Sequence, residues 1–191
     1  MRAFDGFWWP DMDKRGRPAI VAGCADAVPV IMALVPEKRV CVQAGGNVGV
    51  YPKALAEFFE RVVTFEPDAD NLACLHKNVT WPNVLIWNAA LGDKVGSCGI
   101  EWVELDNCGA HKVCEGGSVP MMTIDSLELD QCDLIWLDIE GHEAKAIEGA
   151  RETIERFSPI IALEEKGLGE VASLPGYRRI NRIGNDTVYS K

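Results

Sequence analysis

The sequence predicts one α/β domain with a mostly parallel sheet that helices cover on both faces. The first observation is length, because 191 residues can bury one substantial core but are short for two domains. The second is composition, since 48% apolar and 25% charged residues are typical of a globular chain. The third is order: from residue 39 onward, short β-rich runs alternate with amphipathic stretches, which is the pattern of βαβ units.

The first part of the chain does not follow this alternation. Residues 1–20 are rich in aromatics, glycine and proline, which predicts an irregular arm. Residues 22–35 are mostly apolar and predict a buried helix, with a start or a kink at Pro29. We therefore expect residues 1–38 to form an arm and a helix that pack on a catalytic part formed by residues 39–191, all within a single domain.

The alternating part is expected to supply the parallel strands and the helices that cover them. In the longest helical stretch, Ile147, Ala150, Ile154 and Phe157 recur every three or four residues and mark one apolar face. The expected strands are residues 40–42, 62–65, 84–87, 134–137 and 160–163, and the expected helices are residues 53–61, 70–77 and 143–157.

Two segments depart from the alternation. Residues 92–119 contain several glycines and mixed polarity, which predicts a long crossover with room for one hairpin. Near the C-terminus, two β-rich runs flank Gly184-Asn185-Asp186, which predicts an antiparallel hairpin at one edge of the sheet.

Charge and cysteine content exclude several classes of function. A formal charge of −10 opposes binding to nucleic acid, because an acidic surface repels phosphates. Seven scattered cysteines without a CxxC pair argue against a disulfide framework or a zinc site. The longest apolar stretch, residues 28–35, is short of a membrane span, and residues 1–10 lack a signal-peptide core. We expect a cytoplasmic protein that does not bind membranes.

The residues that follow the first two strands indicate a cofactor site. In a doubly wound sheet, ligands bind beyond the carboxyl ends of the strands. The first strand is followed by QAGGNVG, where glycines allow a tight turn and a close approach to a ligand. Glu66 follows the second strand, 21 residues after Gly45, at the spacing where an acid accepts hydrogen bonds from an adenosine ribose. The pair predicts an adenosine-containing cofactor.

Known nucleotide fingerprints do not fit this loop. Counted from Gly45, the second and third glycine positions of GxGxxG hold Asn47 and Val50, which argues against a dinucleotide site. No GxxxxGK[ST] string follows the first strand, which argues against a P-loop.

The order of several motifs resembles the FkbM family of S-adenosylmethionine-dependent methyltransferases. The resemblance covers residues 40–165 and leaves both ends of the chain outside it. The blocks that carry it are, in order, AGGNVGVY, TFEPDADNLACLHKNV, NAALGD, MTIDSL, DLIWLDIEGHEAKAIEGA and PIIALEE.

This resemblance implies a Rossmann-like seven-stranded methyltransferase sheet, mostly parallel with an antiparallel C-terminal hairpin strand. It also implies S-adenosylmethionine as cofactor and methyl transfer to a hydroxyl of a small molecule or glycan. Glu66 is then expected at the ribose, Asn88 with Ala89 at the adenine, and Asp138 beside the sulfonium. Gln43 stands where the family usually has an acid, which should weaken cofactor binding. The expected cofactor-binding residues are Gln43, Gly45, Gly46, Asn47, Gly49, Glu66, Asn88, Ala89 and Asp138.

Transfer to a hydroxyl also needs a group that accepts its proton. Asp138, Glu140 and His142 lie in one short segment after the fourth strand and are the candidate bases, and the sequence leaves the choice among them open. A second possibility is metal-assisted transfer, with a divalent cation held by Asp138, Glu140 and Asn107. A third is a protein that binds the cofactor or its product S-adenosylhomocysteine without turnover.

Several other residues have both a structural and a functional interpretation. Glu143 is either a cleft acid or an ordinary acid at the start of a helix. The remaining candidates for contacts with cofactor or acceptor are His111, Gly109, Trp8, Trp9, Arg178, Arg179 and Arg182.

Overall fold

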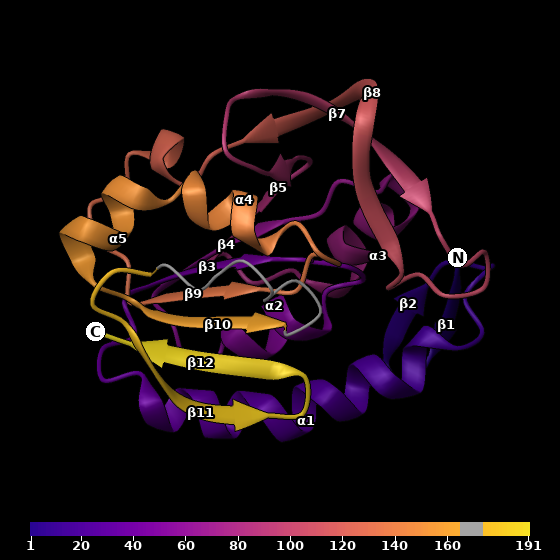
Figure 1. The fold of residues 1–191 in the computed structure, drawn as a ribbon. Coiled ribbons are helices and arrows are strands. Elements are labelled where there is room, and N and C mark those ends of the chain that lie inside the picture. Colours follow the sequence, from indigo (N-terminus) through magenta and orange to yellow (C-terminus); the bar gives the residue numbers. More distant parts are fainter. Residues whose placement is uncertain (165–173) are drawn as a thin grey trace.

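The computed structural model describes residues 1–164 and 174–191, and Glu165 of the last motif lies outside them. Its centre is a seven-stranded sheet with the strand order β11-β12-β10-β9-β3-β4-β5 (Figure 1). The strands from β10 to β5 are parallel, and β12 pairs antiparallel with β10 and with β11. The sheet strands are β3 (Val40–Ala44), β4 (Arg61–Phe65), β5 (Val84–Trp87), β9 (Leu134–Leu137), β10 (Ile160–Glu164), β11 (Arg178–Ile183) and β12 (Asp186–Ser190). This confirms the mostly parallel sheet with an antiparallel C-terminal hairpin.

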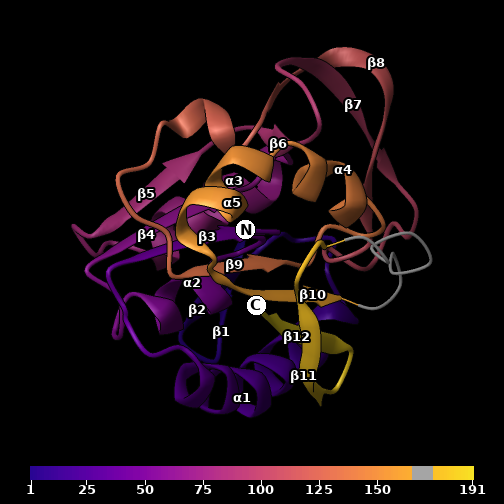
Figure 2. The same ribbon diagram turned by 60° about the vertical axis from the view of Figure 1, so that its left-hand side comes forward.

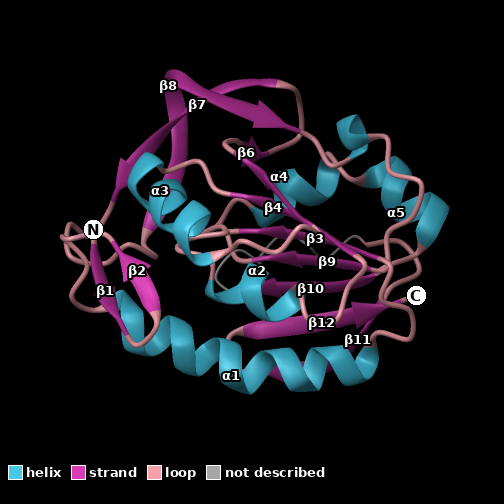
Figure 3. Ribbon diagram, turned by 180° about the vertical axis from the view of Figure 1, so that it is seen from behind, coloured by secondary structure: helices cyan, strands magenta, loops and turns pink. Residues whose placement is uncertain are grey.

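Helices cover both faces of this sheet, because side chains alternate along its buried strands. One face packs against α1 (Gly16–Leu34) and α2 (Val50–Leu55), and the other against α4 (Glu143–Glu148) and α5 (Arg151–Phe157) (Figures 1 and 3). In β9, for example, Leu134 and Trp136 face the α1 side, whereas Ile135 and Leu137 face the other. Helix α3 (Ala69–Asn78) connects β4 to β5.

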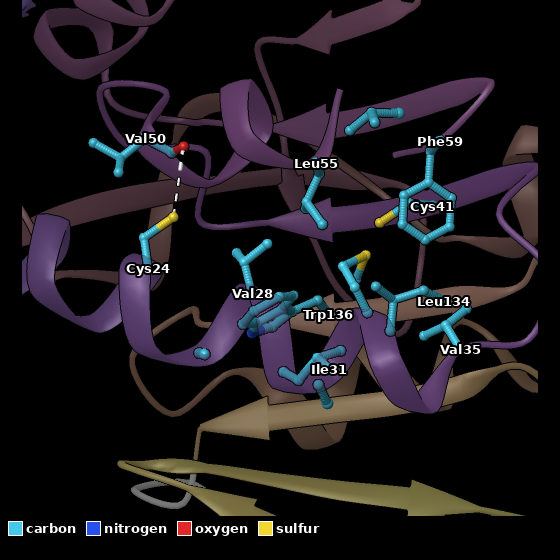
Figure 4. Packing of buried hydrophobic residues seen from close by; sticks show 14 of the residues in the cluster. Cys24, Val28, Ile31, Val35, Cys41, Val50, Leu55, Phe59, Leu134 and Trp136 are labelled. Carbon is cyan, nitrogen blue, oxygen red and sulfur yellow. Dashed lines mark hydrogen bonds between the residues drawn. The ribbon is translucent and has the colours of Figure 1, made fainter. Parts of the chain in front are cut away.

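The core on the α1 side joins the N-terminal helix to the sheet. Cys24, Val28 and Ile31 point from α1 toward the strands, where they lie near Trp136 (Figure 4). The Cys24 thiol also donates to the carbonyl of Val50 at the start of α2, at 3.8 Å. Residues 1–38 therefore share one core with the sheet, and our proposed division of the chain at residue 38 separates segments and not independent cores.

Length and composition would allow α1 to cross a membrane, which corrects the expectation that no stretch is long enough. The helix has 19 residues and a mean hydropathy of 1.5, and 28% of the apolar window is buried. The same properties occur in core helices of soluble folds, and here α1 packs on the sheet.

The arm is more regular than expected. Residues 1–20 contain a hairpin of β1 (Arg2–Phe4) and β2 (Phe7–Trp9), and α1 already begins at Gly16 and continues through Pro29 (Figure 3). The side chain of Asn78 in α3 accepts from the N–H of Trp8 at 2.7 Å and donates to its carbonyl at 2.8 Å. This contact across 70 residues holds the short hairpin, and no local pattern reveals it.

The helix expected over residues 143–157 is two helices. A Cβ on Gly149 would overlap the carbonyl oxygen of Gly92, so the chain passes close to another segment at the break. The carboxylate of Asp125 then accepts from the N–H groups of Glu152 and Thr153 and caps α5. The helix expected over residues 53–61 also begins and ends earlier, as α2 directly after Gly49.

The segment between β5 and β9 forms a small second sheet and confirms the expected hairpin. Strands β7 (Gly96–Trp102) and β8 (His111–Met122) are antiparallel, and the short β6 (Ala90–Leu91) pairs parallel with β8. A 3-10 turn (Asp125–Leu127) leads toward β9. Figure 2 shows β7 and β8 standing away from the main sheet on the side of α4.

Candidate functional site

A cavity of about 440 Å³ lies at the carboxyl ends of β3, β4, β9 and β10. Its wall comes from the loops after these strands, from α1, from the β7–β8 hairpin and from the turn between β11 and β12. The residues singled out in the sequence that line it are Gly45, Asn47, Glu66, Ala89, Asn107, Gly109, His111, Asp138 and Glu140. Those that do not line it are Trp8, Trp9, Gln43, Gly46, Gly49, Asn88, His142, Glu143, Arg178, Arg179 and Arg182.

The glycine loop, residues 45–49, lines the cavity beside β9. Gly45 and Gly49 adopt positive φ angles of +83° and +97°, which an L side chain rarely adopts. A Cβ on Gly45 would overlap the carbonyl oxygen of Asp138. The N–H of Gly46 donates to the carbonyl of Phe65 at 2.8 Å, which ties the loop to the end of β4. Gly46 and Gly49 therefore shape the loop from outside the cavity wall.

Replacement of Gly45 by alanine should destabilise the fold, because the new methyl group meets a backbone carbonyl and the positive φ is strained. We expect the free energy of unfolding to fall by about 3 kcal/mol or more, measured by urea denaturation. Gly116→Ala is the matched control, since Gly116 has φ +78° and an added Cβ there would meet nothing within 4 Å. An equal loss in both variants would show that strain alone, and not the close approach to Asp138, accounts for the effect.

Glu66 lies buried between the first two loops. Its Oε2 accepts from the N–H of Asn47 at 2.6 Å, and its Oε1 accepts from the N–H of Asp68 at 2.8 Å. Burial raises the pKa of Glu66 to about 7, against the opposing effect of these two N–H groups. Each carboxylate oxygen can accept more than one hydrogen bond, so the side chain can hold the loops and a ligand together.

Gln43 supports the loop from inside the sheet. Its amide nitrogen donates to the carbonyls of Ala44 and Gly45 at 3.1 and 3.0 Å, and its Oε1 accepts from the Thr64 hydroxyl at 2.5 Å. A carboxylate at this position would have no proton to donate to the two carbonyls. The amide therefore satisfies the buried groups around it and lies behind the cavity wall.

Carboxylates dominate the wall opposite Glu66. Asp138 and Glu140 follow β9, Glu164 ends β10 and Asp186 begins β12. Carboxylate oxygens of Asp138, Glu140 and Glu164 lie within 4.8 Å of one another. Burial, followed by the charges of Glu164 and Asp186, raises the pKa of Asp138 well above its usual range. Burial also raises the pKa of Asp186 to about 6. The arrangement suits a cationic ligand.

Two predicted residues brace the site without lining the cavity, and a third lies apart from it. Asn88 donates to the carbonyls of Glu66 and Pro67 at 3.2 and 3.4 Å. Glu143 is buried, and its Oε1 accepts from the N–H groups of Ile139 and Gly141, so it holds the loop after β9. His142 precedes α4, and its Nε2 lies near Gly92, outside the cavity wall.

The loop between β7 and β8 is anchored over the glycine loop. The carbonyl of Cys108 accepts from the side-chain amides of Asn47 and Asn71 at 2.9 and 2.8 Å. The N–H of Cys108 donates to the fully buried carboxylate of Asp13 at 3.1 Å. Asn47 therefore contacts both the cavity and the crossover loop, and it connects the N-terminal arm with the glycine loop through Cys108.

Sequence reasoning missed two groups of residues in this site. Glu164 ends a parallel strand, so the rule that identified Glu66 and Asp138 also applies to it. Asp13 and Asn71 lie in segments whose position depends on contacts with Cys108, and no spacing in the sequence indicates them. The other polar lining residues outside the prediction are Arg15, Asp26, Tyr51, Asn185 and Asp186, and the rest are apolar or small side chains from α1, the strand ends and the two hairpins.

Comparisons with known proteins identify the family of this chain. The family model described as methyltransferase FkbM domain matches residues 43–178, more than half of the chain. Hexuronic acid methyltransferase AglP of Haloferax volcanii is 24% identical over 161 residues, which are 80% of this chain and 64% of that protein. The chain thus spans less than two thirds of this relative.

Solved structures show the same fold. Methyltransferase FkbM from Methylobacillus flagellatus matches with a TM-score of 0.57 and 21% identity over 81% of this chain and 44% of that one. SMU.1697c of Streptococcus mutans, solved in complex with SAH, matches with a TM-score of 0.50 and 13% identity over 92% and 96%. Because the family model covers residues 43–178, which include the glycine loop, Glu66 and Asp138, the chain belongs to the methyltransferase FkbM family.

Proposed function

We propose that the protein transfers a methyl group from S-adenosylmethionine to a hydroxyl of a glycan or small molecule. The observation that carries this proposal is the cavity that brings the strained glycine loop, Glu66 and Asp138 together. Its volume of about 440 Å³ lies in the usual range for sites that hold small ligands. An SAH complex in a structural neighbour adds support.

The charges in the cavity fit this cofactor. The bound cofactor supplies a methyl group on a positively charged sulfur and also carries an ammonium group. Asp138, Glu140 and Glu164 place negative charge on one side of the cavity and oppose these positive groups. On the other side, Glu66 accepts from ribose hydroxyls, and Ala89 leaves room for a flat base.

Asp138 is the base that we propose for the acceptor hydroxyl, with Glu140 as the alternative. Both line the cavity, whereas His142 does not, so we no longer propose His142 as the base. Burial raises the pKa of Asp138, which makes this carboxylate a stronger base than an exposed one and suits a group that takes a proton during the reaction. The remaining task of the protein is to align acceptor and methyl group and to exclude water.

The acceptor is proposed to be neutral. AglP is named a hexuronic acid methyltransferase, which supports a sugar acceptor for this chain as well. The cavity, however, is lined by Asp138, Glu140, Glu164 and Asp186 and by Arg15, which already pairs with Glu104 and Asp106. Like charges oppose a carboxylate acceptor, so a sugar hydroxyl fits better than a uronate carboxylate.

Turnover with methyl-labelled S-adenosylmethionine tests the proposal. Purified protein is incubated with neutral hexosides and with the matching hexuronosides, and formation of S-adenosylhomocysteine is measured. Labelled ether on a neutral sugar is the expected product. Labelled ester on the uronates alone would contradict transfer to a hydroxyl, and saturable cofactor binding without any product would favour a binding protein without turnover.

Metal-assisted transfer is a second candidate, because three carboxylates lie close enough to share a divalent cation. The group consists of Asp138, Glu140 and Glu164, and Asn107 instead donates to Glu104 at 3.0 Å. If a cation lowers the pKa of the acceptor hydroxyl, dialysis against EDTA should abolish turnover, and Mg²⁺ or Mn²⁺ should restore it. Unchanged turnover after EDTA would remove this candidate.

A further inference from the structure

The side chain of His111 is buried in the cavity wall and has no hydrogen-bond partner in the described part of the chain. It is 8% exposed, and neither of its ring nitrogens forms a hydrogen bond within residues 1–164 and 174–191. The nearest acid, Asp68, lies 3.5 Å from Nδ1, and this carboxylate oxygen already accepts from the indole of Trp102 at 3.1 Å. A buried polar group without a partner is costly, which points to a ligand that supplies one.

The surrounding structure fixes the position of this imidazole. His111 and Trp102 are cross-strand partners in the β7–β8 hairpin, and their rings stack with 5.2 Å between centroids and 5° between planes. Three residues before His111, Cys108 is hydrogen-bonded to the cofactor loop, to α3 and to the N-terminal arm. The stacking and the anchored Cys108 therefore hold the imidazole in place before any ligand enters.

The location of His111 identifies the part of the ligand that it meets. Its neighbour Asp68 donates its backbone N–H to Glu66, so the imidazole lies on the Glu66 side of the cavity. The same hairpin adds Ile100 and Val113 to the cavity wall, and Ala89 belongs to that wall too. Apolar walls around one polar ring suit a flat purine with donors and acceptors along its edge.

We propose that His111 binds the adenosine part of the cofactor and is a recognition residue of this site. Burial lowers the pKa of His111, so the imidazole is neutral near pH 7, with one nitrogen that donates and one that accepts. The edge of adenine also offers both an amino group and ring-nitrogen acceptors. This assignment rests on the proposed use of an adenosine-containing cofactor.

Calorimetry with two ligands tests the assignment. S-adenosylhomocysteine contains the whole product, and 5′-methylthioadenosine contains the adenosine without the amino-acid end. His111→Phe keeps a ring against Trp102 but removes both nitrogens, so both ligands should bind about five- to tenfold more weakly, as expected for one lost hydrogen bond. His111→Gln restores a donor and an acceptor and should recover part of the loss. His76→Phe, on the exposed side of α3, is the matched control and should bind like wild type.

Each other outcome has a defined meaning. Equal affinity of His111→Phe and wild type for both ligands would overturn the assignment, as would a loss for S-adenosylhomocysteine alone. Equal weakening in His111→Phe and His111→Gln would show a packing role and would overturn it too. If wild type itself bound neither ligand, the proposed function would fail, and this result differs from the others because it appears before any substitution.

Discussion

Replacement of Glu66 by alanine is expected to weaken the binding of S-adenosylhomocysteine by about a hundredfold. In the proposed complex the carboxylate accepts hydrogen bonds from the ribose, and hydrogen bonds to a charged group are each worth about 1.5–3 kcal/mol. Glu66 also accepts from the N–H groups of Asn47 and Asp68, so its loss relaxes both loops that face the ligand. Isothermal calorimetry measures the change, with 5′-methylthioadenosine as the ligand that isolates the adenosine part.

The control separates binding from folding. Glu57→Ala removes an exposed acid outside the cavity wall and should leave affinity unchanged. Glu66→Ala will also lose stability, because two backbone N–H groups lose their acceptor, so its thermal unfolding must show that it is folded at the temperature of the titration. A folded Glu66→Ala protein with wild-type affinity would remove Glu66 from the ribose site.

The pKa of Glu66 predicts how this binding changes with pH. Burial raises the pKa to about 7 in the free protein, so the carboxyl is largely protonated at pH 6 and largely ionised at pH 8. Ribose hydroxyls favour the ionised acceptor, so the complex has the lower pKa and binding releases protons. We expect affinity to fall by up to about tenfold from pH 8 to pH 6, with a smaller change in Glu66→Gln. Affinity that rises toward pH 6 would contradict this assignment.

Individual strands of the main sheet could be anticipated because their signals are local. Residues 84–87 and 134–137 are apolar runs flanked by polar residues, and both are strands with these bounds. Contacts between distant segments determine the features in which the structure differs from the prediction. The break at Gly149 depends on Gly92 and Asp125, and the N-terminal hairpin depends on Asn78.

The same distinction applies to the site. Gly45, Glu66 and Asp138 each follow a parallel strand, and topology alone brings such positions to one edge. The cavity wall contains all three. His111 lies in a crossover without periodicity. Its position follows from the hydrogen bonds of Cys108 to Asn47 and Asp13, which lie 61 and 95 positions earlier in the chain. Such long-range hydrogen bonds become visible only in the folded structure.

Asp138→Asn is expected to lower kcat by at least about a hundredfold while affinity for S-adenosylhomocysteine changes by less than about fivefold. Asparagine keeps the size of the side chain but cannot take the acceptor proton, and a positioned base contributes about 10²–10⁴ in rate. Burial and the charges of Glu164, Asp186 and Glu140 raise the pKa of Asp138. The wild-type rate should therefore rise with pH as Asp138 ionises, and the variant should lose that dependence.

Two further variants assign the effect to Asp138. Glu140→Gln changes the alternative base on the same loop, and Asp5→Asn makes the same chemical change in the β1–β2 turn, where φ is 48° and asparagine is well tolerated. If Asp138 is the base, its variant alone loses the pH-dependent rate. If Glu140→Gln loses it and Asp138→Asn does not, the proton goes to Glu140. A rate that survives in both would leave the carboxylate cluster with an electrostatic role only, since a cavity with this charge opposes the positive sulfur whether or not it accepts a proton.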